Sequence, residues 1–238
     1  MSLDESRNQT QSRRWTRAIL IILVLVPVLF NAIMLLPEVT VPVPSENDDI
    51  AHFVLVRQAN EALDLGANPV DFWVPQLELG LPEFLYYQHL PHLAVVLLHR
   101  LLLKRVALFT LFNLVRYLLM VLFPLTVYWS MRTMEFSPIS SAIGAGFGSL
   151  ISANHDFGFD YENYLWLGYG LYTQIWGMHL FFISIACLQR LITRGTGYLA
   201  AILSTSALVL CHLVYAYMMG ITTIVLFLLA VASESEAS

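Results

Sequence analysis

An uninterrupted apolar run of about 19 residues, from Ala18 to Leu36, constrains this chain more than any other feature. A helix needs about 20 apolar residues to cross the hydrocarbon layer of a bilayer. The run is longer than the apolar region of a secretory signal and leads into Pro37 without a small-residue cleavage site, so it predicts an uncleaved anchor. The composition agrees, because only 12% of the 238 residues are charged, against about 25% in a soluble domain.

Further apolar runs predict an all-α fold, a polytopic transmembrane helical bundle of about six spans. The expected spans cover residues 17–36, 106–130, 137–153, 173–192, 197–213 and 215–232. They divide the chain into a polar tail (1–16), a first span (17–36), a loop with short surface helices (37–105), a helical bundle (106–232) and a second polar tail (233–238). The last two spans adjoin without a polar loop, so they form one bent helix or two helices that meet near His212 and Tyr217.

Basic residues set the expected orientation. Lys and Arg prefer the cytoplasmic side, and the first span is preceded by Arg7, Arg13, Arg14 and Arg17. We therefore expect an integral protein of the cell membrane, with a cytoplasmic N-terminus and residues 38–88 outside. The short apolar core of residues 89–103 favours a helix lying at the outer face, and the alternative is a seventh span. Counting basic residues does not separate these two topologies.

The loop at 38–88 concentrates acidic residues, nine of the 17 in the chain. Ser45 and Asp48 have the spacing of a capping box, which predicts a helix from about Asn47. Asp48 and Asp49 then lie four and three residues before His52, on neighbouring positions of one helix. One explanation is that the acids offset the helix dipole. The other is a catalytic pair that takes a proton from an acceptor hydroxyl or holds a divalent cation on a phosphate.

The rest of this loop is broken by Gly and Pro into a series of turns. Trp73, Tyr86 and Tyr87 supply flat apolar faces there. Aromatic faces beside acids suit a sugar ring, and an interfacial aromatic belt is the competing explanation. Since no basic stripe of the kind that follows phosphates is present, the sequence predicts no nucleic-acid partner.

A second acidic group directly follows the third expected span and contains Asp156, Asp160 and Glu162. These residues form either a solvated loop or a second carboxylate site that faces the first and holds a cation such as Mg²⁺ or Mn²⁺.

Two ionisable residues, Arg116 and His212, fall inside expected spans. Such groups usually face the bundle interior or a water-filled cavity. Arg116 meets a lipid phosphate, pairs with a carbonyl or carboxylate, or snorkels to the interface. His212 is a satisfied buried histidine or a substrate contact. Zinc is not expected at His89, His92 and His99, because no acid lies at clear metal-ligand spacing from them.

One family resembles this pattern over roughly residues 15–215. An acid pair and a histidine directly after the first span, followed by Gly66-Ala67-Asn68-Pro69, Trp73-Val74-Pro75, Gly80-Leu81-Pro82 and Leu85-Tyr86-Tyr87-Gln88-His89-Leu90-Pro91, look like the membrane glycosyltransferases of the GT-C fold. The likeness is greatest to the proteins called 6-pyruvoyl-tetrahydropterin-synthase-related membrane proteins, a label that implies no pterin chemistry here. Arabinofuranosyltransferase-like proteins and oligosaccharyltransferase catalytic subunits are similar more distantly.

The resemblance implies transfer of a sugar from a polyprenyl-phosphate donor to an acceptor on the outer face, with the lipid tail between helices. Asp48 and Asp49 match the position of the family's first acidic motif, and Asp156, Asp160 and Glu162 that of a second one, which implies a catalytic role for the first pair and a metal-binding role for the second group. From their chemistry we also expect substrate contacts from His52, Trp73, Tyr86, Tyr87, Arg116 and His212. The family usually has 11 or more spans, so this chain corresponds to the N-terminal half or to a short form. An inactive relative, or a non-enzymatic membrane protein that binds lipid or a partner, is the alternative.

Overall fold

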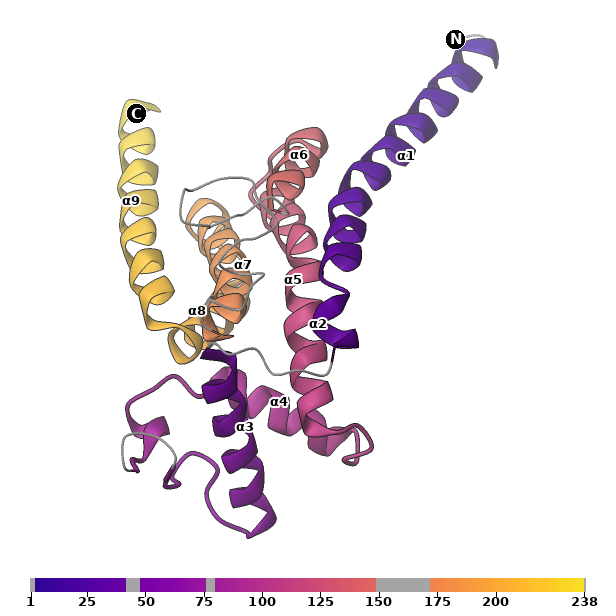
Figure 1. Ribbon diagram of the computed structural model, residues 1–238. Coiled ribbons are helices and arrows are strands. Elements are labelled where there is room, and N and C mark those ends of the chain that lie inside the picture. Colours follow the sequence, from indigo (N-terminus) through magenta and orange to yellow (C-terminus); the bar gives the residue numbers. More distant parts are fainter. Residues whose placement is uncertain (1–2, 42–47, 76–79, 149–171, 238) are drawn as a thin grey trace, which may run out of the picture.

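The computed structural model of the protein describes residues 3–41, 48–75, 80–148 and 172–237. Within these ranges all regular elements are helical, apart from a single bridge between Val74 and Leu81 (Figure 1). In chain order they are α1 (Leu3–Met34), α2 (Pro37–Thr40), α3 (Asp48–Asp64), η1 (Glu83–Leu85), α4 (Leu90–Leu101), α5 (Leu108–Thr133), α6 (Pro138–Gly148), α7 (Tyr172–Arg194), α8 (Tyr198–Cys211) and α9 (Leu213–Ala237). The predicted all-α membrane bundle is confirmed.

Four helices in the described ranges are long and apolar enough to cross a membrane. Their candidate spans are Trp15–Met34, Leu108–Thr133, Tyr172–Arg194 and Leu213–Ala232. The expected span at 137–153 contains α6, with 11 described residues, and its residues 149–153 lie outside the described part of the chain. The expected span at 197–213 contains a shorter helix, α8, of 14 residues. At 1.5 Å per residue α8 is about 21 Å long, which is less than the roughly 30 Å of the hydrocarbon layer.

The junction between α8 and α9 is a break at one residue. His212 has an extended backbone, with φ −157° and ψ 105°, between two helical segments. Its side chain is nevertheless buried, and its Nδ1 accepts a hydrogen bond from the Tyr215 backbone N–H at 3.3 Å. Of the two sequence alternatives, two helices meeting near His212 is therefore correct.

Helix α5 is bound to the helices on both sides of it through carbonyls near Pro124. Proline has no N–H, so the Met120 carbonyl, four residues earlier, loses its helical donor. Asn31 of α1 donates its side-chain N–H to that carbonyl at 3.0 Å. On α7, Nε2 of His179 donates to the Leu119 carbonyl at 2.7 Å.

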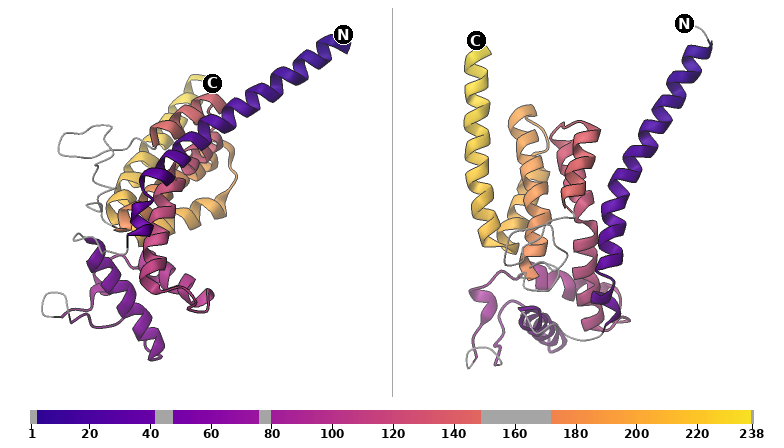
Figure 2. Two further views of the ribbon diagram at one scale, coloured as in Figure 1. Left: turned by 45° about the vertical axis from the view of Figure 1, so that its right-hand side comes forward. Right: turned by 45° about the horizontal axis from the view of Figure 1, so that its top comes forward.

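Helices α1 and α5 run antiparallel. Asn31 contacts Met120, and the next residue, Ala32, accepts a hydrogen bond from the earlier Tyr117 at 2.9 Å. Helix α1 therefore ends, and α5 begins, at the same end of the bundle, where α3 and α4 also lie (Figures 1 and 2). We call this the α3–α4 end. With 12 residues, α4 is too short to cross the bilayer, and the arrangement agrees with the topology in which it stays on one side.

The main apolar core lies at this α3–α4 end. Helix α3 contributes a stripe that includes Val56 and Ala59, both fully buried, and α4 contributes Val95 and Val96. These pack on the start of α5 and on Tyr172, the first residue of α7. The surface helices are consequently fixed to the bundle by an apolar core, and polar side chains on the same stripes become buried with it.

Candidate functional site

The predicted acidic stretch forms the first turn of α3. The described part of that helix runs from Asp48 to Asp64, and the predicted start at about Asn47 lies outside the described residues. Asp49 and His52 continue the stripe of Val56 and Ala59, at steps of three and four residues, and so face the bundle. Both are buried, with exposed fractions of 3% and 5%. Asp49 is therefore not a surface carboxylate, although in the first described turn of α3 it can still offset the helix dipole.

Asp49 forms an ion pair with Arg116 of α5. The Oδ2 to Nη2 distance is 2.6 Å, and the two side chains are 3% and 9% exposed. Arg116 also donates to the Asn113 side-chain oxygen at 3.3 Å and lies over the Phe112 ring, 5.8 Å from its centroid. Of the sequence alternatives for Arg116, pairing with a carboxylate is the one that the structure contains.

His52 is hydrogen-bonded to His92 of α4, with 3.0 Å between Nδ1 and Nε2. Burial, helped by the positive charge of Arg116, lowers the pKa of His52 to about 4. Burial lowers the pKa of His92 well below its ordinary value, and the adjacent His52 acts in the same direction. Both imidazoles are therefore neutral near pH 7, where one ring donates the shared proton and the other accepts it.

Aromatic side chains enclose the histidine pair and tie it to α7. The rings of Tyr87 and Tyr172 lie 5.8 and 5.4 Å from that of His52. Tyr172 donates to the Pro91 carbonyl at 3.2 Å, and the Tyr87 hydroxyl lies 3.3 Å from that of Thr173. Helices α3, α4, α5 and α7 thus each supply a polar group to one buried cluster, which we call the Asp49 cluster.

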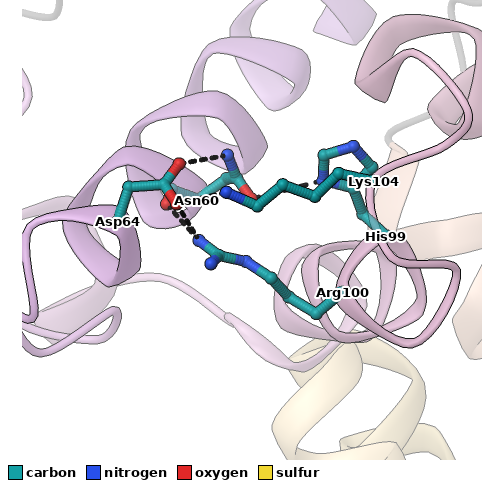
Figure 3. A network of polar contacts seen from close by, with 5 residues as sticks. All are labelled: Asn60, Asp64, His99, Arg100 and Lys104. Atoms are coloured by element: carbon teal, nitrogen blue, oxygen red, sulfur yellow. Dashed lines mark hydrogen bonds and ion pairs between the residues drawn. The ribbon is translucent and has the colours of Figure 1, made fainter.

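A second polar cluster joins the other end of α3 to α4 (Figure 3). Asp64 is paired with Arg100 at 3.0 Å and with Lys104, and Asn60 donates to its Oδ2 at 3.3 Å. Arg100 also donates to the Asn60 carbonyl at 2.8 Å, and Nδ1 of His99 lies 3.3 Å from the Asn60 side-chain oxygen. The hydrogen bond from Lys104 is the main cause of the lowered pKa of Asp64. This Asp64 cluster links the end of α3 to the end of α4.

Three predicted substrate contacts lie apart from the Asp49 cluster. Tyr86 is 79% exposed and Trp73 is 59% exposed. The Trp73 indole lies over Gly80, where a Cβ would clash with it. His212 packs against Gly177, in the first two turns of α7. Of the predicted substrate contacts, only His52, Tyr87 and Arg116 gather around Asp49.

The predicted metal ligands Asp156, Asp160 and Glu162 lie outside the described residues, as does the side chain of Asp48. In the part of the chain that is described, no group of three or more His, Cys, Asp or Glu side chains has the geometry of a metal site. The Oδ2 of Asp49 faces the positive charge of Arg116, and a guanidinium and a metal ion repel each other. Asp49 is therefore a poor cation ligand in this arrangement.

Besides Tyr172, His92 is a member of the site that sequence reasoning missed. It lies 40 residues from its partner His52, so no local spacing connects them. A signal was present in α4, where His92, Val95, Val96 and His99 recur with the helical period and are all buried. This pattern would have placed both histidines on the face that packs against the core.

Comparison of the chain with protein-family models, with curated proteins and with solved structures finds no significant match in any of the three.

Proposed function

We propose that the chain is a membrane glycosyltransferase of the GT-C type, which moves a sugar from a polyprenyl-phosphate donor to an acceptor hydroxyl. The reaction would take place at the α3–α4 end, on the outer face of the cell membrane. The observation that carries the proposal is the buried Asp49–Arg116 pair beside His52. It joins a group that binds phosphate to a group that accepts a proton, next to the start of two candidate spans.

In the proposed mechanism the donor phosphate competes with Asp49 for Arg116. An arginine binds phosphate through two parallel hydrogen bonds, so the incoming phosphate would release the carboxylate. Asp49, or Asp48 before it, would take the proton from the acceptor hydroxyl. The hydroxyl oxygen would then bond to the anomeric carbon while the bond from that carbon to the phosphate oxygen breaks, and polyprenyl phosphate would leave. His52, neutral near pH 7, would donate or accept a hydrogen bond on the phosphate or the sugar.

A groove between α1 and α6 suits the polyprenyl tail. It has a volume of about 430 Å³ and is lined by apolar side chains of both helices, among them Phe30 and Phe147. The α1 side of this groove leads toward the end of α1, where Ala32 contacts Tyr117, the residue after Arg116. A tail in the groove would place its phosphate toward the α3–α4 end. Any Mg²⁺ or Mn²⁺ would depend on Asp156, Asp160 and Glu162.

The test is a transfer assay on the purified full chain, with farnesyl-phosphate-linked mannose and glucose as donor probes and release of farnesyl phosphate as the readout. Asp49→Asn and Arg116→Gln should each abolish release. The matched control is Asp64→Asn, which removes an exposed acid from the same helix and should leave release unchanged. Release by Asp49→Asn at the wild-type rate would refute the role of Asp49.

The second candidate is a non-enzymatic membrane protein. It is favoured by the burial of the Asp49 carboxylate in an ion pair with Arg116. In that case the pair only fastens α3 to α5. Release of farnesyl phosphate by the wild-type chain separates the two candidates, and the charge-exchanged variant Asp49→Arg/Arg116→Asp isolates the fastening role. A fastening role predicts that the exchange restores the stability lost in Asp49→Arg alone. The proposed enzyme additionally needs each group in its own place, so its farnesyl phosphate release would stay abolished.

A further inference from the structure

A polar pocket lies at the opposite end of the bundle from the Asp49 cluster. It has a volume of about 440 Å³ and is lined by Arg132 and Thr133 at the end of α5, by Glu135 just beyond, and by Arg190 and Arg194 at the end of α7. Three arginines and one glutamate give the pocket a formal charge of +2. The groups proposed for sugar transfer lie at the other end of the bundle, so the pocket has no part in that chemistry.

The contacts within the pocket fix the arginines and use one nitrogen of each. Nη1 of Arg132 donates to the Phe136 carbonyl, and Nε of Arg190 donates to the Thr196 hydroxyl at 3.4 Å. Nη2 of Arg194 is paired with Glu135. A guanidinium carries five N–H donors in a planar fork, so these contacts orient the three groups and leave donor capacity for an oxyanion.

Glu135 already supplies one anion to this pocket. It has a positive φ of 71°, a conformation that is uncommon for a residue other than glycine. Its carboxylate pairs with Arg194 across the gap between α5 and α7. The internal carboxylate is an oxyanion held by one arginine of the pocket, and it would compete with any anion from outside.

The position of the pocket indicates where such an anion comes from. The candidate spans of α5 and α7 end at Thr133 and Arg194, so the arginines lie where two helices leave the hydrocarbon layer. Lipid phosphates lie at this depth, and basic groups just outside a span attract anionic headgroups.

We propose that Arg132, Arg190 and Arg194 form a binding site for a phosphate group, carried by an anionic lipid headgroup or free in solution. Arginine forks match phosphate oxygens through paired hydrogen bonds, and a lysine at the same place provides only a point charge. Glu135 lowers the affinity of the site by occupying Arg194.

The experiment measures binding to the purified full chain in detergent, with dioctanoyl phosphatidic acid and inorganic phosphate as separate probes and dioctanoyl phosphatidylcholine as the zwitterionic control lipid. Wild type should bind phosphatidic acid above the control lipid. Arg190→Gln/Arg194→Gln should weaken binding by at least about tenfold, since hydrogen bonds to charged groups are lost. Glu135→Gln should strengthen binding. Arg190→Lys/Arg194→Lys keeps the charge and should still weaken it.

The matched control is Arg13→Gln/Arg14→Gln, which removes two arginines of α1 directly before the candidate span Trp15–Met34 and should leave binding unchanged. The N-terminal end of α1 points to the same end of the bundle as the end of α5 (Figure 2). If inorganic phosphate competes with phosphatidic acid for binding, the site recognises the phosphate group in general. If phosphatidic acid binds and inorganic phosphate does not, the site recognises a lipid headgroup. The proposal is overturned if neither probe binds above the control lipid, or if the Arg13/Arg14 control weakens binding as much as the pocket variant. The opposite effects expected for Glu135→Gln and the arginine variants distinguish a site from a general loss of folding.

Discussion

Helix α3 carries an ion-paired aspartate at each of its ends, and the two pairs lie in opposite surroundings. Asp49 is paired with Arg116, and both side chains are almost completely buried. Asp64 is paired with Arg100 and Lys104, and its side chain is 41% exposed. The same functional groups therefore act under different dielectric conditions along one helix of 17 residues.

The comparison separates what an ion pair contributes from what its disruption costs. A buried pair loses the hydration of both charges, so its net contribution to stability is small, although removal of one partner is severe. An exposed pair retains water and is screened by salt, so forming or breaking it changes little. The Asp49 pair should consequently show large effects of single substitution, and the Asp64 pair should show small ones.

The largest effect is expected for Asp49→Ala. It leaves the Arg116 charge buried without its carboxylate, which should lower the free energy of unfolding by about 3–5 kcal/mol. Unfolding of the purified protein in mixed micelles of increasing sodium dodecyl sulfate measures this. The double variant Asp49→Leu/Arg116→Met removes both charges and should be close to wild type in stability. If the double variant is as unstable as the single one, the burial argument is wrong.

Acid pH should have the next largest effect, through the histidine pair of the Asp49 cluster. The folded-state pKa of His52 is about 4, against 6.5 for the free side chain. Between these values the unfolded chain binds a proton that the folded chain does not, so stability is complete above pH 6.5 and falls as the pH is lowered toward 4. Thermal unfolding at a series of pH values tests this. His52→Gln should show a shallower decline, and an equally steep one would contradict the assignment.

Tyr172→Phe should produce a smaller change. It removes the hydrogen bond to the Pro91 carbonyl but keeps the ring, so the free energy of unfolding should fall by about 1 kcal/mol. The same unfolding assay measures it. Tyr86→Phe is the control, because Tyr86 is 79% exposed, and it should have no measurable effect. Equal losses in the two variants would show that the link from α7 to α4 does not stabilise the Asp49 cluster.

The smallest effect is expected for Asp64→Asn. Its pair is open to solvent, so its loss should change stability far less than the loss of Asp49, and the difference from wild type should disappear at high salt. Unfolding at low and high salt concentration tests both statements. A loss as large as that of Asp49→Ala would break the comparison between the two ends of α3.

The sequence predicted those parts of the fold that depend on local chemistry. The apolar runs located the four candidate spans. The residues on which the predicted start of α3 depends, Ser45 and Asn47, lie outside the described residues. The length of the expected span at 197–213 was overestimated relative to α8, because an apolar run does not show where a helix stops when its end is set by packing, as at His212. Residues 149–153 of the expected span at 137–153 lie outside the described residues. Within the candidate site, the three-residue spacing correctly placed Asp49 and His52 on one face.

Long-range partners could not be predicted in the same way. Arg116 lies 67 residues after Asp49. The sequence near either residue does not indicate whether the Arg116 guanidinium pairs with a phosphate, a carbonyl or a carboxylate. The tertiary packing of α3 against α5 makes that choice. His92 was missed for the same reason, although the period of buried positions in α4 identifies its face.

The carbonyls beside Pro124 have a consequence for the order in which the bundle assembles. The ribosome releases α1 before α5, so Asn31 already lies in the bilayer when the Met120 carbonyl enters it and can bond to that carbonyl at once. His179 is made more than 50 residues after Leu119. Pairing of α5 with α1 should therefore come first during synthesis, with α7 joining a hairpin that already exists. Replacing Asn31 would delay insertion of α5 before it affected the finished protein.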